Sequence, residues 1–287
     1  MRPIVQSFFD PHTFTVTYIV QDPGSSACAI VDPVLDFDAA AGRTYTNSAD
    51  KIIAHVRAHD LRVQWIIETH VHADHLTAAQ YLQTQLGGQT VIGALVTRVQ
   101  ETFQTIFNTE KAFPVDGSQF DRLMHDGEKL SVGGLEMHAM HTPGHTPACM
   151  TYLAGDAAFI GDTMFMPDYG SARADFPGGD ARALYRSIRK ILTLPPTTRL
   201  FLCHDYQTPE RTEFVWETTV AAQKSENIHV HDGISEEDFV KMRTARDATL
   251  NMPALILPSV QINMRAGHFP PVEANGVSYL KLPLNYF

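Results

Sequence analysis

The chain has 287 residues, of which 44% are hydrophobic and 19% charged, an ordinary composition for a globular protein with a large core. Its 22 Lys and Arg against 32 Asp and Glu give a formal net charge of −10, which argues against a nucleic-acid or anionic-membrane partner. Residues 1–10 hold one Arg and no long apolar stretch, and no run of 18 apolar residues occurs. We therefore expect a cytoplasmic protein without a membrane span.

Three strands are predicted at the start of the chain, over 4–9, 13–21 and 28–32. The turn signal Asp22-Pro23-Gly24 separates the second from the third, so the opening is predicted to be a β-meander. A helix follows from Asn47 or Ser48 to about residue 59. The apolar run over 63–67 then has the β-branched and aromatic content of a buried strand.

Three imidazoles and a carboxylate come directly after that strand: His70, His72, Asp74 and His75. A helix is predicted over 76–86, so the cluster lies on a strand-to-helix loop. In an extended segment His70 and His72 point to the same side, and Asp74 and His75 follow as the chain turns. The four side chains can therefore converge on one or two cations, and we predict a metal site here rather than a solvated His-rich loop.

The second half repeats the pattern of strands followed by a helix. The glycine pair Gly133-Gly134 predicts a hairpin, and Pro195-Pro196 ends a long amphipathic helix. A Pro at the first helical position predicts a helix opening at Thr208, and a capping box predicts another at Ser235. The predicted strands lie over 90–92, 120–123, 130–132, 135–140, 148–153, 157–160 and 199–203, and the further helices over 97–107 and 181–194.

Strands followed by helices, twice over, predict an α/β protein of the α+β type. Two sheets would pack back to back with helices outside, as a four-layer αββα sandwich. A doubly wound parallel sheet is the weaker alternative, because the glycine turns are hairpin-like. We expect a single domain over residues 1–287, in which 253–287 form a C-terminal extension packed on the body. Three widely spaced cysteines, Cys28, Cys149 and Cys203, predict no disulfide framework.

Further candidate ligands stand where three predicted strands end. They are His145 in Thr-Pro-Gly-His-Thr, Asp162 in Gly-Asp-Thr and His204 in His-Asp-Tyr. Together with the HxHxDH cluster over 70–75, this series resembles the metallo-β-lactamase superfamily over most of the chain. The resemblance implies the αββα fold, with metal at one edge between the two sheets.

Within that superfamily the chain is most similar to the persulfide dioxygenases, in particular to their bacterial branch often labelled β-lactamase-like hydrolase. The similar segments are 173–176 with Gly178-Gly179, 192–195, 204–206 and 263–267. Two segments depart from the mitochondrial-type members. The loop from Asp162 to Arg173 is longer and carries Asp168, and the tail over 268–287 is extra. Both lie in regions that shape substrate pockets.

The resemblance implies one Fe(II) per chain, held by His70, His145 and Asp162, the facial set that leaves open positions on ferrous iron. The implied reaction oxidises glutathione persulfide, or a similar low-molecular-weight thiol persulfide, with O2 to sulfite and thiol, in sulfide detoxification. Arg173 and Tyr206 match thiol-binding positions of the family, although Arg173 could instead form a structural ion pair. His72 and Asp74 would support the ligands from outside.

The alternative is a thioester hydrolase of the glyoxalase II type with two Zn(II) ions. His70, His72 and His145 would hold one ion, Asp162 would bridge, and the second ion would be held by Asp74, His75 and His204. A non-catalytic metal or sulfide sensor is a weaker alternative, because no DNA-binding motif is present. The expected partners are a small thiol persulfide and O2, with neither nucleic acid nor membrane, and a homodimer is one possible assembly.

Overall fold

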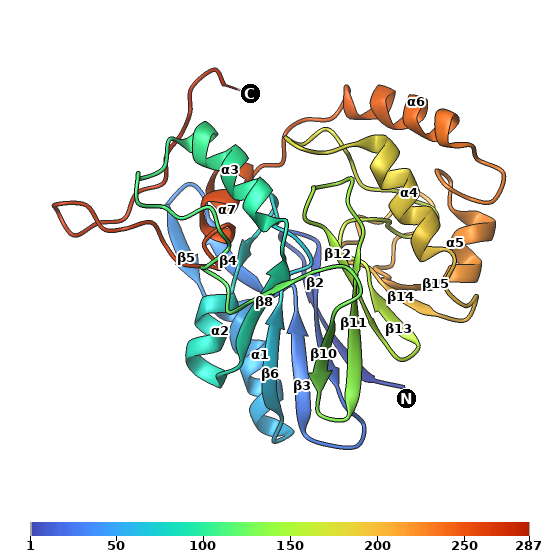
Figure 1. Ribbon diagram of the computed structural model, residues 1–287, viewed down its shortest axis with the longest axis horizontal. Helices are drawn as coiled ribbons and strands as arrows, with labels where there is room; N and C mark the ends of the chain where they lie inside the picture. The colour runs from blue at the N-terminus through green and yellow to red at the C-terminus, as the bar shows by residue number, and fades with distance from the viewer. Residues whose placement is uncertain (1, 287) are drawn as a thin grey trace.

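Two six-stranded sheets face each other in the computed structural model, which describes residues 2–286, and helices cover both outer faces (Figure 1). The predicted αββα sandwich is confirmed. In the first sheet β1 to β3 run antiparallel and the next strands are parallel. In order across the sheet, its strands are β1 (Ile4–Asp10), β2 (Thr15–Gln21), β3 (Ala27–Val31), β6 (Arg62–Ile67), β8 (Gln89–Gly93) and β9 (Arg122–Met124).

The second sheet is antiparallel except where β13 and β14 pair in parallel. Its strands, in order, are β10 (Lys129–Val132), β11 (Leu135–His141), β12 (Met150–Ala154), β13 (Ala157–Phe159), β14 (Arg199–Phe201) and β15 (Glu217–Thr219). A small third sheet joins β5 (Arg43–Tyr45), β4 (Val34–Asp38) and β7 (Leu76–Thr77).

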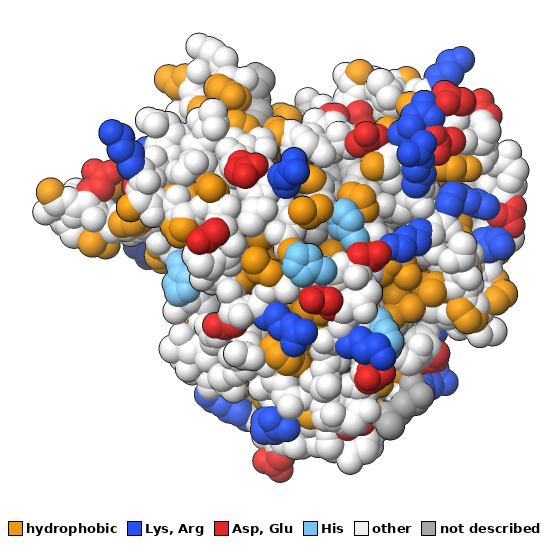
Figure 2. Space-filling view, viewed as in Figure 1, with side chains coloured by type: hydrophobic (Ala, Val, Ile, Leu, Met, Phe, Trp, Pro, Cys, Tyr) orange, Lys and Arg blue, Asp and Glu red, His pale blue; other side chains and the backbone are white. Residues whose placement is uncertain are grey.

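Helices α1 (Asn47–Ala58) and α2 (Ala79–Leu86) pack on the first sheet, and α3 (Val96–Phe107) and α7 (Ile256–Asn263) lie on the same side of the molecule (Figure 1). On the outside of the second sheet lie α4 (Ala181–Ile191), α5 (Val220–Glu226) and α6 (Glu236–Asp247). Helix α4 buries Leu184, Ile188 and Ile191 at helical spacing. Ion pairs join α4 to α6, where Lys and Arg side chains lie beside Asp and Glu in Figure 2.

The main core fills the space between the two sheets. Tyr18 from the first sheet and Tyr152 and Phe159 from the second are at most 2% exposed. Strand β11 alternates buried and exposed side chains at its start, with Leu135 and Met137 turned inward, as the two-residue period of a strand requires. The edge of this sandwich is therefore a rigid frame for the loops that leave its strands.

Three local predictions are wrong. No helix opens at Thr208, because Thr208 pairs with Arg211 in a tight turn, and Arg211 binds Asp168 and Asp205 by charged contacts of 2.6–2.7 Å. The helix predicted over 76–86 starts only at Ala79, since Leu76–Thr77 pair with β4. Helix α7 was not predicted, because Pro253 and Pro258 suggested a tail, yet Pro258 lies in the first turn, where a helix tolerates proline.

The C-terminal helix α7 is tied directly to the His-rich loop by Asn263. Its amide nitrogen donates to the carbonyls of His72 (2.9 Å) and His75 (2.8 Å), and its amide oxygen accepts from the Thr77 nitrogen (2.8 Å). Asn263 is 3% exposed, so water cannot replace these bonds. Beyond α7 the chain forms an extended arm with exposed apolar side chains such as Val272 (67%), drawn in red at the left of Figure 1.

Replacing Asn263 with Ala should lower the free energy of unfolding by about 2–4 kcal/mol, because two carbonyls and one N–H would stay buried without partners. Urea unfolding of the two proteins measures this difference. Asn251→Ala is the matched control, since Asn251 is exposed and its side chain makes no hydrogen bond in the described chain. Equal losses in the two variants would contradict the anchoring role of Asn263.

Candidate metal centre

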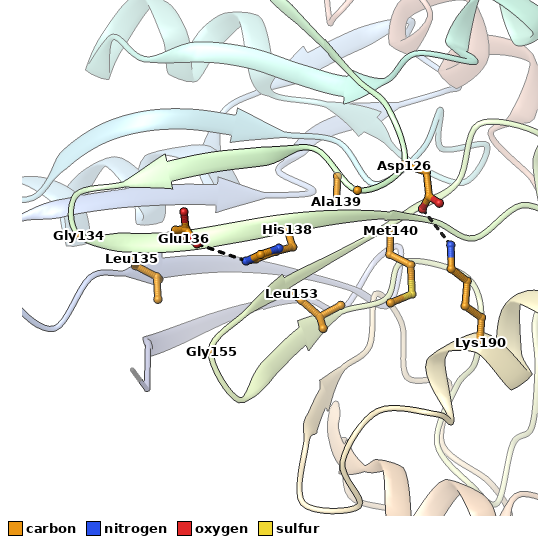
Figure 3. Close-up of a pocket in the computed structure, with 11 residues that line it drawn as sticks. Asp126, Gly134, Leu135, Glu136, His138, Ala139, Met140, Leu153, Gly155 and Lys190 are labelled. Carbon is orange, nitrogen blue, oxygen red and sulfur yellow. Dashed lines mark hydrogen bonds and ion pairs between the residues drawn. The ribbon is translucent and has the colours of Figure 1, made fainter.

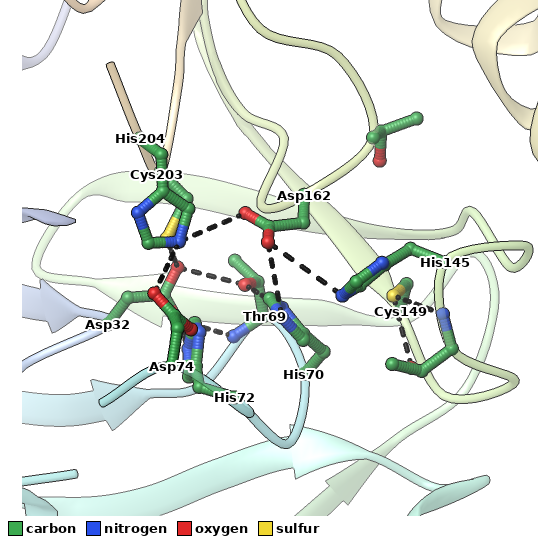
Figure 4. A network of polar contacts seen from close by, with 12 residues as sticks. Asp32, Thr69, His70, His72, Asp74, His145, Cys149, Asp162, Cys203 and His204 are labelled. Carbon is green, nitrogen blue, oxygen red and sulfur yellow. Dashed lines mark hydrogen bonds and ion pairs between the residues drawn. The ribbon is translucent and has the colours of Figure 1, made fainter. Parts of the chain in front are cut away.

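Four loops meet at one edge of the sandwich and bring the sequence-predicted ligands together (Figure 4). The loop after β6 carries the HxHxDH segment, and the loops that follow β11, β13 and β14 carry His145, Asp162 and His204. The side chains are removed from water, since His70 is 1%, His145 5% and Asp162 7% exposed. Residues separated by more than 130 positions in the chain thus share one buried polar cluster.

Two glycines allow these loops to approach one another. Gly161, which precedes Asp162, has a φ of +51°, and a Cβ there would lie 2.6 Å from the Thr69 Oγ1. Gly144, which precedes His145, has a φ of +138°, and a Cβ there would lie 2.2 Å from the backbone nitrogen of Leu184. Side chains are excluded at both positions, so the glycines of the two motifs are required by close backbone packing.

Each histidine of the cluster uses one ring nitrogen to bond outward. His145 Nδ1 lies 2.8 Å from the Arg173 carbonyl, and His75 Nδ1 lies 3.1 Å from the Leu76 carbonyl. His204 Nδ1 lies 3.2 Å from the Phe14 carbonyl. A carbonyl only accepts, so these Nδ1 atoms carry the protons and the Nε2 atoms are left with free lone pairs.

Asp32 fixes the two remaining imidazoles. It accepts from the Thr69 nitrogen (2.7 Å) and the Thr69 Oγ1 (2.8 Å), so that hydroxyl can accept from His70 Nδ1 at 3.0 Å. His72 Nε2 lies 2.9 Å from Asp32 and 3.3 Å from Glu68. These contacts use the other ring nitrogen of each histidine and leave His70 Nε2 and His72 Nδ1 without a hydrogen-bond partner. The sequence alone did not single out Asp32 and Glu68, although Asp32 ends the predicted strand over 28–32 and Glu68 follows the one over 63–67.

The freed atoms face one another and have no hydrogen-bond partner. His70 Nε2 and His145 Nε2 lie 3.9 and 3.7 Å from Asp162 Oδ2, and His204 Nε2 lies 3.4 Å from Asp162 Oδ1. Nitrogen and oxygen ligands bind metals at about 2.0–2.2 Å, so two donors of one ion can be up to about 4 Å apart. The residues therefore fit a metal ion. The buried atoms of the candidate ligands without a hydrogen-bond partner are His70 Nε2, His72 Nδ1, Asp74 Oδ2, His75 Nε2, Asp162 Oδ1 and His204 Nε2.

Burial and neighbouring charges set the protonation of the cluster. Burial and the surrounding imidazoles hold the pKa of His70 well below its usual value, and burial lowers the pKa of His75 to about 4. Burial would also lower the pKa of His72, but Asp32 and Glu68 outweigh it and raise that pKa well above the usual value. At neutral pH His70 and His75 are thus free bases, the form that binds metals.

A cavity of about 370 Å³ opens onto the cluster. His145, Asp162 and Asp74 form part of its wall, and Arg173 and Tyr206 line it as well. The remaining wall is mostly aromatic and apolar, with Phe14, Phe165, Tyr169, Phe176 and Leu255 among its residues. Polar groups that converge beside an aromatic and apolar wall are typical of small-molecule sites.

The guanidinium of Arg173 is already paired. Its Nε and Nη2 lie 2.6 and 2.7 Å from the Asp175 carboxylate, its Nη1 donates to the Asn251 carbonyl, and it stacks on Phe176. Tyr206 stacks on His204 with ring centroids 5.5 Å apart. Asp168 is bound by Arg211 rather than by the cluster. Arg173 therefore forms a structural ion pair with Asp175 and also lines the cavity.

A second cavity, of about 710 Å³, lies on the second sheet, away from the cluster of candidate metal ligands (Figure 3). Its wall includes the exposed face of β11, with Glu136 and His138, and the ion pair between Asp126 and Lys190. None of the candidate metal ligands lines it. The smaller cavity is therefore the one that belongs to the candidate site.

A sequence model of the metallo-beta-lactamase superfamily matches residues 11–204, which hold every candidate ligand. The chain belongs to this superfamily. A probable metallo-hydrolase of Burkholderia pseudomallei is 59% identical over 98% of this chain and 99% of its own. A protein named glyoxylase B2, from Dictyostelium discoideum, is 48% identical over 98% and 97%.

More distant superfamily relatives carry a different name. The mitochondrial persulfide dioxygenase ETHE1 of Bos taurus is 30% identical over 92% of this chain and 89% of its own. The crystal structure of ETHE1 from Myxococcus xanthus is 28% identical, covers 92% of this chain and 100% of its own, and superposes with a TM-score of 0.74. Among the described residues of this superfamily member, no helix has the length and apolar character to cross a membrane.

The shifted imidazole pKa values predict how the stability of the metal-free protein depends on pH. The depressed pKa values of His70 and His75 contribute stability that is complete above pH ~6.5 and is lost as the pH falls through the folded-state pKa values, which for His75 is about 4. The raised pKa of His72 contributes stability that is complete below pH ~6.5 and is lost as the pH rises through its folded value. The metal-free protein should thus be most stable near pH ~6.5.

Urea unfolding in the presence of a chelator, between pH 5 and 8.5 in steps of about half a unit, measures this profile. His75→Gln should flatten the acidic side and leave the alkaline side unchanged. A metal-free protein that becomes steadily more stable from neutral pH to pH ~5 would contradict the assignment.

Proposed function

We propose that this protein is a persulfide dioxygenase that uses one Fe(II) held by His70, His145 and Asp162. The observation that carries the proposal is that ligand atoms of His70, His145 and Asp162 lie within 4.8 Å of one another, and that His145 and Asp162 line a cavity with an aromatic wall. Two imidazoles and a carboxylate are the facial set of oxygen-using ferrous enzymes. The similarity to persulfide dioxygenases over nine-tenths of the chain supports the same reaction.

When bound, Fe(II) supplies open coordination positions and the electrons with which O2 is activated. The residues of the chain orient the metal ligands and form the wall of the substrate cavity. The carbonyl of Arg173 keeps the proton of His145 on Nδ1, and the ring of Phe176 meets the His145 ring edge-on at 5.0 Å and shields it from water. Tyr206 and Phe165 form an aromatic wall beside the carboxylate of Asp162, against which a thiol chain can pack.

In the net reaction one thiol persulfide, one O2 and one water give the free thiol, sulfite and two protons. The S–S bond breaks, the outer sulfur loses four electrons, and O2 takes them up; two oxygens of sulfite come from O2 and the third from water. We infer that the substrate is a glutathione-like persulfide, because the cavity of about 370 Å³ can accept a molecule of that size class. Sulfide detoxification in the cytoplasm is the proposed setting.

A metallo-hydrolase of the glyoxalase II type is the second candidate, and a specific observation favours it. Asp74, His75 and His204 each present a buried unpartnered atom, so donors for a second ion are present. The names metallo-hydrolase and glyoxylase B2 belong to relatives more similar than the dioxygenases. In this hydrolase His72 Nδ1 would join the first metal, and zinc would be the metal.

Substitution of single ligands separates the one-metal from the two-metal centre. Asp162→Ala should abolish iron binding, because two protein ligands hold a divalent ion poorly, whereas His204→Ala should retain most of the iron. Metal content of protein purified without added metal measures the difference. The matched control, Asp168→Ala, removes a nearby carboxylate that binds Arg211. Equal loss in Asp162→Ala and His204→Ala would favour the binuclear hydrolase.

The reaction class is tested by metal replacement. The iron protein should consume O2 only when glutathione persulfide is present and should form sulfite in step with the O2 used. Zinc cannot exchange electrons with O2, so the zinc protein should be inert in this assay. Thioester hydrolysis by a two-zinc form, without persulfide-dependent O2 uptake by the iron form, would replace the dioxygenase proposal by the hydrolase.

A further inference from the structure

Three arginines line the cavity that opens onto the metal cluster: Arg173, Arg243 and Arg246. The first two are neutralised by carboxylates. Arg173 forms its two-bonded pair with Asp175, and Arg243 forms another with Asp247 at 2.9 Å from Nε and 2.7 Å from Nη2. An arginine whose fork is already filled by a carboxylate has little capacity left for an anionic ligand.

Arg246 differs from both, because its guanidinium has no ion pair and no hydrogen bond within residues 2–286. It is exposed at the rim of the cavity and lies in the last turn of α6. It lies close to His229 and Arg243, since its charge helps to lower the pKa values of both. The carboxylate next to it, Asp247, is already paired with Arg243. An unpaired cation at a cavity mouth is positioned to attract an anion in a protein whose net charge is −10.

The helix that carries Arg246 is held firmly in place. Asp247, 5% exposed, accepts from the Ala174 nitrogen at 3.0 Å, and Arg243 donates to the Ser171 carbonyl at 3.1 Å. These two bonds attach the end of α6 to the segment that forms the cavity wall beside the metal ligands. The backbone of Arg246 is therefore fixed relative to the cluster, while its side chain is free to meet a ligand.

We propose that Arg246 binds a carboxylate of the thiol substrate at the mouth of the cavity, far from the reacting sulfur, and so selects thiols that carry such a carboxylate. The nature of the substrate as a thiol persulfide rests on the function proposed above. The sulfur end lies at His145 and Asp162, and the carboxylate end lies at the α6 rim. Arg173 then serves mainly as a structural residue, through its pair with Asp175 and its carbonyl on His145.

A purely structural role for Arg246 makes a different prediction. A basic residue in the last turn of a helix interacts favourably with the helix dipole, and its removal would lower stability by a few tenths of a kcal/mol up to about 1 kcal/mol. Such a role would change the melting temperature of the protein without changing its affinity for a small ligand. Binding and stability must therefore be measured on the same variants.

The experiment is calorimetric titration of the metal-loaded full chain with S-methylglutathione and with its diethyl ester. The methyl group blocks the thiolate, so binding does not depend on a bond between sulfur and metal. We expect Arg246→Ala to weaken binding of S-methylglutathione about tenfold and to leave binding of the diester unchanged. Arg246→Lys should restore part of the loss, because it restores the charge without the planar fork.

Lys241→Ala is the matched control, since it removes one positive charge from an exposed position of α6 that does not line the cavity. It should leave both affinities unchanged. Equal affinity of wild type and Arg246→Ala for S-methylglutathione, an equal loss for the ester, or no binding to wild type would overturn the proposal. Failure of the iron protein to use O2 with a persulfide would instead overturn the dioxygenase function and leave carboxylate binding by Arg246 intact.

Discussion

Two of the candidate metal ligands, His70 and His72, are oriented by a single buried carboxylate, that of Asp32. Asp32 leaves the end of β3 in the left-handed region, at a φ of +51°, which is uncommon for a residue other than glycine. In this position it accepts from the backbone and the hydroxyl of Thr69 and from His72. Burial pushes the pKa of Asp32 upward, but His72 and Thr69 outweigh burial and leave the pKa below its usual value. The residue thus stays charged inside the protein.

Asp32 orients the imidazole rings of two histidines, one through Thr69 and one by direct contact. Thr69 links Asp32 to His70, and His72 contacts Asp32 directly, so both imidazole rings have a defined orientation before any metal binds. On the other side of the loop, Asn263 of α7 holds the carbonyls of His72 and His75. The loop is therefore fixed between the start and the end of the chain. This arrangement keeps several lone pairs buried without partners, a cost that metal binding offsets.

The sequence predicted the layers of the fold, and the candidate ligands that it singled out lie together at one edge of the sandwich. The alternation of buried and exposed residues in β11 and the apolar spacing in α4 can be recognised within a short stretch of sequence. The same holds for the HxHxDH segment and for the short motifs that carry His145, Asp162 and His204. The ring orientations could not be predicted, because they depend on carbonyls of Phe14 and Arg173, contributed by distant segments. Every residue has a backbone carbonyl, so the residue types do not show which carbonyl accepts from a given histidine.

The failures of prediction have a common physical cause. At Thr208 a local helix signal was overridden by the charged contacts of Arg211, and at α7 proline signals concealed a helix stabilised by packing and by Asn263. The pairing of Arg173 with Asp175 was one of two readings that the sequence allowed. Nothing in the sequence pointed to a role for Arg246, because an unpaired arginine is recognised only when the partners of its neighbours are known. Tertiary contacts decide each of these cases.

The central claim is that the freed nitrogens of His70 and His145, with the carboxylate of Asp162, hold one metal ion. Anomalous diffraction at the iron edge, on crystals of protein purified without added metal, tests this claim most directly. The expected result is a single iron peak bonded to His70 Nε2, His145 Nε2 and Asp162, with His72 still bound to Asp32. Two metal peaks bridged by Asp162, with bonds to His72 Nδ1, Asp74, His75 and His204, would contradict it.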